Sequence, residues 1–470
     1  MMKLTIRNNV QVSYVNEAFD DFLYNSLTMM NPIWVENHRL GRFNWKTDKE
    51  LFFYEEKGEN GFYAPRGFLK NIVKYCVKHN HKYEIKIKTC AFEDINIDFS
   101  GQLKPFQDVA TKIMLQDDIG TLCAPTGSGK TVMGIYMMAV RKQPTIIIVH
   151  TKELLFQWID RIKEFTNIDE EDIGVIGSGQ LDEDKHVTVA LVQTLKKHPE
   201  LVNTYGYLLV DECHRCPSKT FTDIVKGYDG KFLTGLSATP FRRDGLSKCI
   251  EFYCGPILHK IEPAALIKEG HIIGIEAIIR KTNFIASMEN PADEYSKLLK
   301  ELSWDKERNL MIVADIVDAV KSGETCLVLS DRKAHCQELS DVLYQESNLN
   351  STVLTGDVGI DKRRQIVKDV NDGSIKVLVC TGQLIGEGFD CKNLTAVFLT
   401  LPVRFSGRVI QYIGRVLRPK PGKDKALVYD YIDPSVKCLW NGVKARQKEY
   451  DKLEVKKEVK PCKANSQETN

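Results

Sequence analysis

The sequence of 470 residues has little net charge and no long apolar run, and both absences narrow the possible functions. A formal net charge of only +2 means that no overall positive field draws the protein to polyanions, so any nucleic-acid surface must be a local groove. No apolar segment is long enough to cross a membrane, and no signal-peptide pattern is present. We therefore expect a cytoplasmic protein with no membrane partner.

The cysteines lack the spacing of a disulfide framework or a zinc site. The 13 cysteines are scattered, and several lie inside apolar runs, which favours free thiols in a reducing compartment. Cys213 and Cys216 form one C-x-x-C pair, but no second pair follows at a suitable spacing. We interpret this pair as ordinary residues rather than as half of a metal site.

The most specific pattern that is present runs from Ala124 to Thr131, A-P-T-G-S-G-K-T, between an apolar segment and a helix-like one. Glycine lets backbone N–H groups approach a phosphate chain, a lysine reaches the outer phosphates, and a hydroxyl suits Mg²⁺. The pattern departs from the full phosphate-loop consensus at Ala124, where glycine is usual. The residues predicted to bind the nucleotide are Pro125, Thr126, Gly127, Ser128, Gly129, Lys130 and Thr131, with Thr131 also a Mg²⁺ ligand.

A second pattern is a pair of carboxylates, Asp211 and Glu212, at the end of an apolar strand. At the carboxyl end of a parallel strand the pair would face the phosphate-binding crevice. Asp211 is predicted to hold Mg²⁺, and Glu212 to orient or deprotonate the attacking water, because phosphoryl transfer depends mainly on positioning and charge neutralisation. Acidic residues after strands are also common helix caps, so the pair takes its meaning from the phosphate loop.

Runs of Val, Ile and Leu separated by helical periods predict an α/β fold with two parallel-sheet lobes in tandem. The expected strands are 121–123, 145–149, 187–192, 207–210 and 232–236 in the first lobe, and 272–279, 325–329, 351–354, 376–379, 396–399 and 426–429 in the second. The predicted domains are a small α+β module at 1–98, the lobes at 99–262 and 263–440, an inserted helical element near 284–306, and a charged tail at 441–470, expected as a helix that frays into disorder.

The module at 1–98 shows no catalytic set of residues, but its basic side chains alternate with aromatic ones. Such a pattern could grip nucleic acid by stacking and charge. An ordinary half-buried sheet explains it equally well. The residues concerned are Trp34, Arg42, Trp45, Phe62, Tyr63 and Arg66.

Several motifs, in order, resemble those of the superfamily 2 helicases. Asp211 to His214 (D-E-C-H) resembles the D-E-x-H box, and Ser237 to Thr239 (S-A-T) resembles motif III. Thr381 to Asp390 resembles motif V, and Gln411 to Arg418 (Q-Y-I-G-R-V-L-R) resembles motif VI. The resemblance implies two recombinase-A-like (RecA-like) lobes that use ATP with Mg²⁺ and close on it.

The resemblance also assigns roles to residues. The implied catalytic residues are Lys130, Asp211, Glu212, Gln411, Arg415 and Arg418. Arg415 and Arg418 share one helix face and could offer fixed, planar charge to the γ-phosphate. Motif V adds Gly388 and Asp390 to the nucleotide site, and Gln107, in K-P-F-Q, resembles the glutamine that reads adenine. Coupling of hydrolysis to lobe movement is implied for Ser237, Ala238 and Thr239.

The nucleic-acid contacts implied by the family lie in loops that follow strands of both lobes. Hydroxyl and amide groups there suit phosphate oxygens, although each residue could equally be a helix cap or a turn residue. The matching positions are Thr151, Lys152, Gln193, Thr194, Ser330, Arg332, Thr355, Gly356, Thr381 and Gly382.

Within the superfamily, the D-E-C-H spelling and the runs 237–245 and 411–419 most resemble the XPB, RadD and phage UvsW branch. This branch acts mostly on forked, branched or damaged DNA, commonly from 3′ to 5′, in replication, recombination or repair. The expected partners are therefore single-stranded, forked or branched DNA and proteins of those processes. An RNA-dependent ATPase and an ATP-gated DNA clamp without unwinding stay open as alternatives. No complete metal-dependent nuclease set is present, which disfavours a restriction-type motor with its own nuclease.

Overall fold

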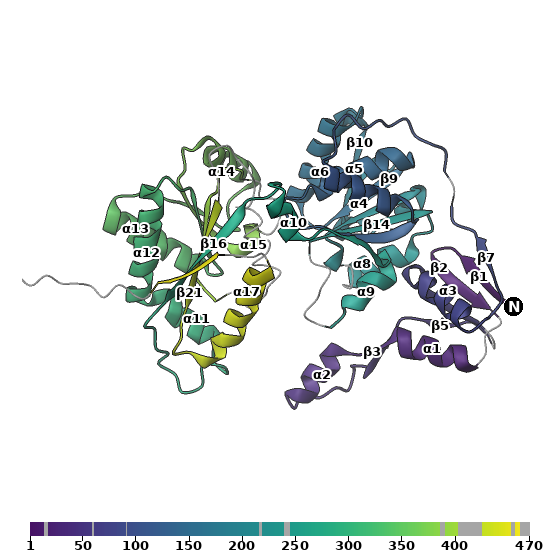
Figure 1. The fold of residues 1–470 in the computed structure, drawn as a ribbon, viewed down its shortest axis with the longest axis horizontal. Helices are drawn as coiled ribbons and strands as arrows, with labels where there is room; N and C mark the ends of the chain where they lie inside the picture. The colour runs from purple at the N-terminus through teal and green to yellow at the C-terminus, as the bar shows by residue number, and fades with distance from the viewer. Residues whose placement is uncertain are drawn as a thin grey trace, which may run out of the picture. The chain divides into compact units, whose positions relative to one another are not determined.

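The computed structural model describes residues 1–13, 17–58, 61–90, 92–215, 219–238, 245–385, 391–402, 425–452 and 456–460. The chain divides into two compact units, residues 1–124 with 129–261 and residues 125–128 with 262–470. Each unit contains a large, mostly parallel sheet with helices on both faces (Figure 1). The predicted α/β class with two parallel-sheet lobes and a small N-terminal α+β module is confirmed.

The N-terminal module is a five-stranded sheet, in the order β5-β6-β2-β1-β7, covered by helices. Alternate residues of its strands, such as Leu4, Val10 and Val12, are fully buried against Phe19 and Ile72 of the helices. A separate two-stranded sheet, β3-β4, flanks a short helix. The elements are β1 (Met2–Ile6), β2 (Asn9–Ser13), α1 (Glu17–Leu27), β3 (Thr28–Met30), α2 (Pro32–Arg39), β4 (Glu50–Phe52), β5 (Glu55–Glu56), β6 (Gly61–Pro65), η2 (Arg66–Phe68), α3 (Leu69–Lys78) and β7 (Tyr83–Ile87).

The first lobe is an eight-stranded sheet in the order β11-β10-β12-β9-β13-β14-β8-β15, parallel except at β11. Its central strands are continuous buried runs, as strands covered on both faces require. The sequence did not indicate β10 or β15. The elements are α4 (Pro105–Leu115), β8 (Ile119–Cys123), α5 (Lys130–Arg141), β9 (Thr145–Val149), α6 (Lys152–Phe165), η3 (Glu170–Asp172), β10 (Ile173–Gly177), β11 (Gln180–Leu181), β12 (Val187–Leu191), α7 (Val192–Leu195), η4 (Pro199–Thr204), β13 (Tyr207–Asp211), η5 (Cys213–Arg215), α8 (Lys219–Gly227), β14 (Phe232–Ser237), α9 (Ser247–Cys254) and β15 (Ile257–Lys260).

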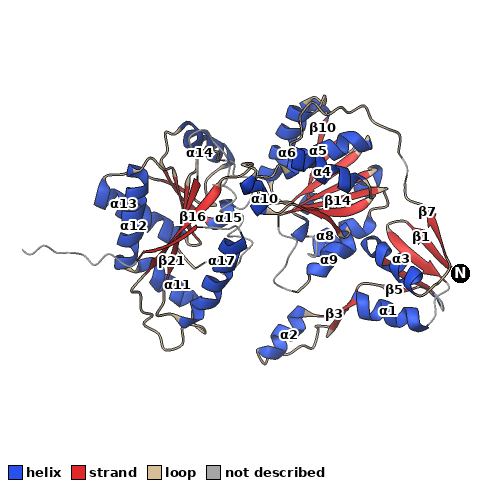
Figure 2. Ribbon diagram, in the orientation of Figure 1, coloured by secondary structure: helices blue, strands red, loops and turns tan. Residues whose placement is uncertain are grey.

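The second lobe is a seven-stranded parallel sheet in the order β18-β19-β17-β20-β21-β16-β22, again with helices on both faces (Figure 2). The predicted helical element near 284–306 is represented by α11, which packs on a small apolar cluster of its own with Leu298 and Leu302. The elements are α10 (Pro263–Lys268), β16 (Gly274–Lys281), α11 (Tyr295–Trp304), α12 (Lys306–Lys321), β17 (Cys326–Ser330), α13 (Lys333–Ser347), β18 (Thr352–Leu354), α14 (Ile360–Asp372), β19 (Val377–Thr381), α15 (Gly382–Ile385), β20 (Ala396–Leu399), β21 (Lys425–Ile432), η6 (Lys437–Leu439), α17 (Trp440–Lys452) and β22 (Lys456–Lys460).

The tail from residue 441, predicted as a helix that frays into disorder, does contain a helix, but the expected disorder is wrong for residues 456–460, which form a strand. Residues 440–452 form α17, and β22 adds a parallel strand beside β16. Arg446 and Tyr450 of α17 are fully buried, and both donate to Asp430 Oδ2 of β21, at 2.9 and 3.0 Å. The Lys/Glu-rich composition did not indicate this buried helix, because its contacts with Asp430 are made by an arginine and a tyrosine rather than by a continuous apolar face. Residues 461–470 lie outside the described part.

The N-terminal module packs directly on the first lobe. The buried guanidinium of Arg66 donates to the carbonyl oxygens of Gly230 and Lys231, at 2.7 and 2.9 Å. Phe252 of α9 belongs to the apolar core of the module, with its ring 5.2 Å from that of Phe53. Buried, charge-assisted hydrogen bonds and a shared core are features of a fixed rather than a sliding contact.

Gly67, between these contacts, offers a test of how tightly the module is held. A Cβ at Gly67 would lie 1.9 Å from the carbonyl oxygen of Glu251, so Gly67→Ala must push the module away from α9. We expect a loss of about 3 kcal/mol in the free energy of unfolding, the upper range for overpacking, measured by urea denaturation. Gly227→Ala is the matched control, because a Cβ there meets nothing within 4 Å. Equal stability of the two variants would contradict a tight contact.

Candidate functional site

The phosphate loop joins β8 to α5, and its two glycines have backbone angles that other residues rarely adopt. Gly127 has φ +87° and Gly129 has φ +83°. The loop folds back on itself: Lys130 Nζ donates to the carbonyl oxygen of Ala124 at 3.2 Å, and Ser128 Oγ donates to that of Pro125 at 2.7 Å. Thr131 follows in the first turn of α5, whose N-terminus offers backbone N–H groups. This geometry suits an anionic phosphate chain.

Gln107 lies against this loop. A Cβ added to Gly129 would be 2.4 Å from Gln107 Nε2, so only glycine leaves room for the amide at that point. Gln107 Oε1 accepts a hydrogen bond from Lys104 N at 2.9 Å, which caps α4. The predicted adenine-reading residue is therefore beside the phosphate loop, with its carbonyl oxygen engaged by its own helix.

The two carboxylates lie where β13 ends. Asp211 is buried, and its Oδ2 accepts a hydrogen bond from Trp158 Nε1 of α6 at 2.9 Å, while its Oδ1 accepts one from Glu212 N, also at 2.9 Å. Glu212 itself has φ +49°, which is uncommon for a residue with a side chain. Trp158 was not predicted, because no motif marks it and it is far from Asp211 in the sequence.

The environment separates the acidities of the two carboxyl groups. Burial and the neighbouring charge of Glu212 raise the pKa of Asp211 above its usual range. Burial also opposes ionisation of Glu212, but the charge of Lys130 and the imidazole of His214 outweigh it and lower the pKa of Glu212 to about 2. Because the pKa of Asp211 is raised, its ionised form is costly, and a bound divalent cation would stabilise that form.

Ser237 links the phosphate loop to the acidic pair. Its carbonyl oxygen accepts a hydrogen bond from Ala124 N at 2.9 Å, and its Oγ lies 3.1 Å from His214 Nδ1. The same imidazole nitrogen lies 3.1 Å from Glu212 Oε2. Ala238 follows at the end of β14, and Thr239 lies outside the described residues. A change at Glu212 therefore reaches β14 through one side chain, His214.

The order of the sheet explains why these groups meet. The phosphate loop, the carboxylates and Ser237 follow or end β8, β13 and β14, which are neighbours in the order β13-β14-β8. Since the strands are parallel, their carboxyl ends share one edge. The edge brings together a phosphate cradle, a lysine and two carboxylates, which is a set suited to holding and cleaving a nucleoside triphosphate.

The predicted nucleic-acid residues follow other strands at the same kind of edge. Thr151, Lys152, Gln193 and Thr194 come after β9 and β12, which are neighbours in the first sheet, and Ser330, Arg332, Thr355, Gly356, Thr381 and Gly382 come at or after β17, β18 and β19 in the second. Some of these groups already have local partners. Thr151 Oγ1 accepts from Leu154 N at 3.3 Å and caps α6, and Gly382 is buried.

The remaining predicted site residues, Gly388, Asp390, Gln411, Arg415 and Arg418, lie outside the described residues.

Comparisons with known proteins identify the family. Residues 99–242 match the family described as "Type III restriction enzyme, res subunit", and residues 308–420 match "Helicase conserved C-terminal domain". A protein of Acanthamoeba polyphaga mimivirus named "Putative ATP-dependent RNA helicase" is 27% identical over 74% of this chain and 67% of its own length. The "DNA 3'-5' translocase XPB2" of Sulfurisphaera tokodaii is 25% identical over 68% of this chain and 79% of its own. The chain belongs to the superfamily 2 helicases.

The helicase also resembles the "ATP-dependent DNA helicase uvsW" of Enterobacteria phage T4, with 25% identity over 66% of this chain and 64% of the phage protein. The predicted likeness to XPB and UvsW is thereby confirmed. The fold matches that of S. cerevisiae Dbp5, with a TM-score of 0.54 and 17% identity over 76% of this chain and 90% of Dbp5. The parallel sheets are accordingly two RecA-like lobes, and the protein is an enzyme of the ATP-dependent helicase class.

The residues of the helicase that could hold Mg²⁺ are oxygen donors. Asp211 offers a carboxylate and Thr131 a hydroxyl, which are the hard ligands that Mg²⁺ prefers. Within the described ranges, no group of three or more His, Cys, Asp or Glu could hold a metal ion without other ligands. The donor set therefore fits Mg²⁺, for which Asp211 and Thr131 would supply protein ligands and which would neutralise phosphate charge. No described helix is long and apolar enough to span a membrane.

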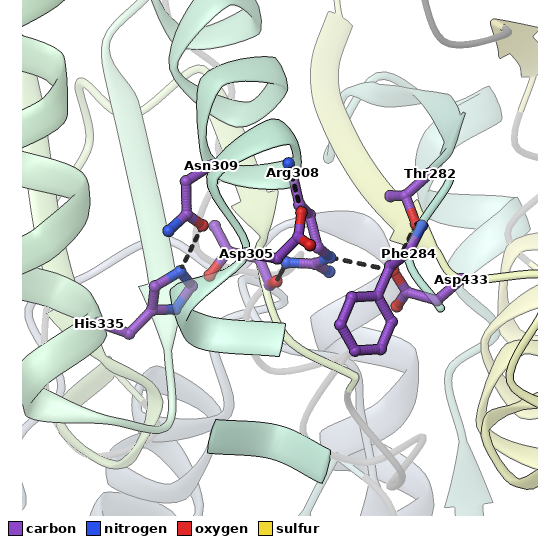
Figure 3. A network of polar contacts seen from close by, with 8 residues as sticks. Thr282, Phe284, Asp305, Arg308, Asn309, His335 and Asp433 are labelled. Atoms are coloured by element: carbon purple, nitrogen blue, oxygen red, sulfur yellow. Dashed lines mark hydrogen bonds and ion pairs between the residues drawn. The ribbon is translucent and has the colours of Figure 1, made fainter. Parts of the chain in front are cut away.

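In the second lobe, a buried polar network that includes Asn309 and His335 (Figure 3) also holds the turn that contains Ser330 and Arg332. His335 Nε2 lies 3.1 Å from Asn309 Oδ1, and His335 Nδ1 lies 3.0 Å from Ser330 Oγ. Asn309 Nδ2 donates to Ser303 O, so its Oδ1 is the acceptor and His335 Nε2 carries the proton. Burial, with nearby arginine charge, lowers the pKa of His335 to about 3, so the imidazole is neutral. The hydroxyl of Ser330 donates to His335 and accepts from Arg332 N, and so fixes the turn.

The same helix, α12, carries a fully buried ion pair. Arg308 Nε donates to Asp433 Oδ1 at 3.0 Å, and Thr282 Oγ1 donates to the same oxygen at 2.6 Å (Figure 3). Both charged side chains are almost completely buried, at 0% and 1% exposure. Removal of one partner would leave the other charge uncompensated in the core.

Arg308→Met should therefore destabilise the second lobe by about 3–5 kcal/mol, the usual cost of breaking a buried pair. Urea denaturation with hydrogen exchange of β20 and β21 would measure and locate the loss. The exposed pair of Lys333 and Asp357 provides the control, because Lys333→Met should cost less than about 1 kcal/mol. Adding Asp433→Asn to Arg308→Met should recover part of the loss. A small effect of Arg308→Met alone would contradict the expectation that Asp433 is left as an uncompensated buried charge.

Proposed function

We propose that this helicase is a DNA-dependent motor that hydrolyses ATP and moves along one strand, from 3′ to 5′, on forked or branched DNA. The observation that carries the proposal is the common edge of β8, β13 and β14, which holds Lys130, the Asp211–Glu212 pair and Ser237. The relatives named as a DNA 3'-5' translocase and a DNA helicase support DNA as the track.

In the proposed reaction the phosphate loop and Lys130 hold the β- and γ-phosphates of ATP. Asp211 and Thr131 hold Mg²⁺, which neutralises phosphate charge when it is bound. A carboxylate with a pKa of about 2 is a weak base, so Glu212 is better suited to orient the attacking water than to keep its proton. Gln411, Arg415 and Arg418 are proposed, from motif VI, to complete the site with fixed positive charge on the γ-phosphate.

The step from chemistry to movement is proposed to pass through Ser237. His214 lies 3.1 Å from both Glu212 Oε2 and Ser237 Oγ, so loss of the γ-phosphate beside Glu212 would alter the end of β14. Hydroxyl, amide and cationic groups after β9, β12, β17, β18 and β19 would contact the phosphates of the tracking strand. A cycle of changing grip between the two lobes would then advance the protein along DNA, in replication, recombination or repair.

The experiment is a comparison of ATP hydrolysis without nucleic acid, with single-stranded DNA and with single-stranded RNA of the same sequence. We expect DNA to stimulate hydrolysis several-fold more than RNA. The relative named as an RNA helicase favours the second candidate function, an RNA-dependent ATPase. Greater stimulation by RNA would establish that candidate instead, and no stimulation by either polymer would overturn both.

A further inference from the structure

The N-terminal module carries an arm, residues 28–52, whose helix contributes nothing to an apolar core. The arm consists of β3, α2, a loop and β4, and none of the eight residues of α2 is buried. In the loop after α2, Phe43 is 98% exposed and Trp45 is 87% exposed. Two large rings in water only two positions apart are unusual, because burying such rings is among the strongest stabilising effects available to a chain. The rings therefore need an explanation outside the fold of the module.

The backbone of the tip of the arm, residues 42–46, is held by several hydrogen bonds. Gly41, at φ +65°, ends α2, and Arg42 N donates to Asn37 O at 2.8 Å in the six-residue bond of a Schellman turn. Asn44 then ties the tip to the helix: its Nδ2 donates to Trp34 O at 3.1 Å and its Oδ1 accepts from Asn37 Nδ2 at 3.0 Å. Phe43 and Trp45 flank Asn44, so these bonds hold the backbone from which the two rings project.

The base of the arm is anchored in the same way. Asn31 caps α2 through Ile33 N and donates its Nδ2 to Asp48 O at 2.8 Å, which closes the two ends of the arm on each other. Met29 of β3 and Phe53, which follows β4, pack against both the core of the module and the core of the first lobe. A movement of the first lobe would therefore carry the tip with it.

The charges around the rings are those of a surface for a polyanion. Arg42 and Lys46 are exposed beside the rings, and Lys49 follows, against the single exposed carboxylate of Asp48 within residues 42–49. Lys46 Nζ lies 5.8 Å from the centre of the Trp45 ring. Lysine is depleted at the centres of protein–protein interfaces, whereas aromatic rings between cations are the usual platform for single-stranded nucleic acid.

We propose that the tip of the arm binds DNA where a base face is exposed, at the junction between a duplex and a single strand. Phe43 and Trp45 stack on the terminal or unpaired bases, and Arg42 and Lys46 contact the adjoining phosphates. Stacking needs a free base face, so the tip distinguishes a junction from continuous duplex. This inference rests on the proposed function for its choice of DNA.

The test uses the full chain and a forked DNA with 2-aminopurine at the first unpaired position. Phe43→Ala/Trp45→Ala should weaken binding of the fork by about 10- to 100-fold, from the usual energy of base–aromatic stacking. The fluorescence change seen with the wild type should disappear. Trp304→Ala, which removes a half-exposed tryptophan from the second lobe, should bind like the wild type. ATP hydrolysis at saturating single-stranded DNA should stay unchanged in the double variant, since the tip is no part of the phosphate site.

A second variant separates stacking from charge. Arg42→Gln/Lys46→Gln should reduce the slope of log K against log salt by about 1 to 2, because two phosphate contacts are lost. Unchanged fork binding and an unchanged salt slope in both variants would overturn the inference and leave the rings to a protein partner. If the wild type itself binds no nucleic acid, the proposed function fails, and that result is distinct from a wild type that binds and variants that do not differ from it.

Discussion

Glu212→Gln is expected to lower the rate of DNA-stimulated ATP hydrolysis by about 100- to 10,000-fold, the range for loss of a group that handles the attacking water. The side chain keeps its size, and glutamine can still reach His214, so the fold and ATP binding should survive. The carboxylate is needed because it accepts a hydrogen bond from water while carrying negative charge. Steady-state hydrolysis and equilibrium binding of a fluorescent ATP analogue would measure the two effects separately.

The control for Glu212 is Glu171→Gln, an exposed carboxylate of the same lobe in η3, which should leave hydrolysis unchanged. The low pKa of Glu212, about 2, also predicts how the rate of hydrolysis responds to pH. The group stays ionised at every pH well above that value, so the wild-type rate should not fall on its account between about pH 5 and 8. Near wild-type hydrolysis by Glu212→Gln would remove Glu212 from the reaction.

Lys130→Ala is expected to reduce hydrolysis by about 100- to 1,000-fold, as loss of one preorganised charge at the reacting phosphates usually does. Without nucleotide, Lys130 Nζ donates to Ala124 O at 3.2 Å, so the ammonium is already held inside the loop. Unlike Glu212→Gln, this variant should also weaken ATP binding, because the lysine contacts the ground-state phosphates as well. Both variants should therefore hydrolyse ATP slowly, but only Lys130→Ala should bind ATP more weakly.

Loss of Lys130 should also raise the pKa of Glu212, because the ammonium charge lowers that pKa in the wild type. Lys112→Ala, which removes an exposed lysine of α4, is the matched control and should not affect binding or turnover. If Lys130→Ala binds ATP with wild-type affinity and hydrolyses it at a wild-type rate, the phosphate loop is not the site of the reaction.

The sequence predicted the elements whose signal is local. Continuous apolar runs such as 145–149 and 207–210 form central strands. A strand buried on both faces is apolar at every position, so its own sequence is enough to predict it. β10 was missed because two of its five residues, Gly174 and Gly177, are glycine, and β15 because it is a four-residue edge strand that is only partly buried. The burial of helix α17 was not predicted, because its buried groups, Arg446 and Tyr450, are polar and bond to Asp430 on a distant strand.

The site shows the same division. The phosphate loop and the carboxylate pair are contiguous in sequence, so they were predicted by residue number. Trp158, which donates to Asp211, and the Asn309–His335 pair that fixes Ser330, join residues that are far apart in the chain. Nothing in the local sequence of Ser330 distinguishes a phosphate contact from a hydroxyl already engaged in a turn. For that reason the nucleic-acid contacts stay predictions, while the arrangement of the phosphate site has a geometric basis.

We propose that ATP hydrolysis drives movement along DNA and separates its strands. The most direct measurement is ATP-dependent strand separation on a panel of 3′-tailed, 5′-tailed, forked and four-way DNA substrates. We expect the wild type to separate the strands of the 3′-tailed and forked substrates when hydrolysable ATP is present. Glu212→Gln should separate none of them. Strong DNA-stimulated hydrolysis with no separation of any substrate would contradict it and would describe a clamp or a translocase that does not unwind.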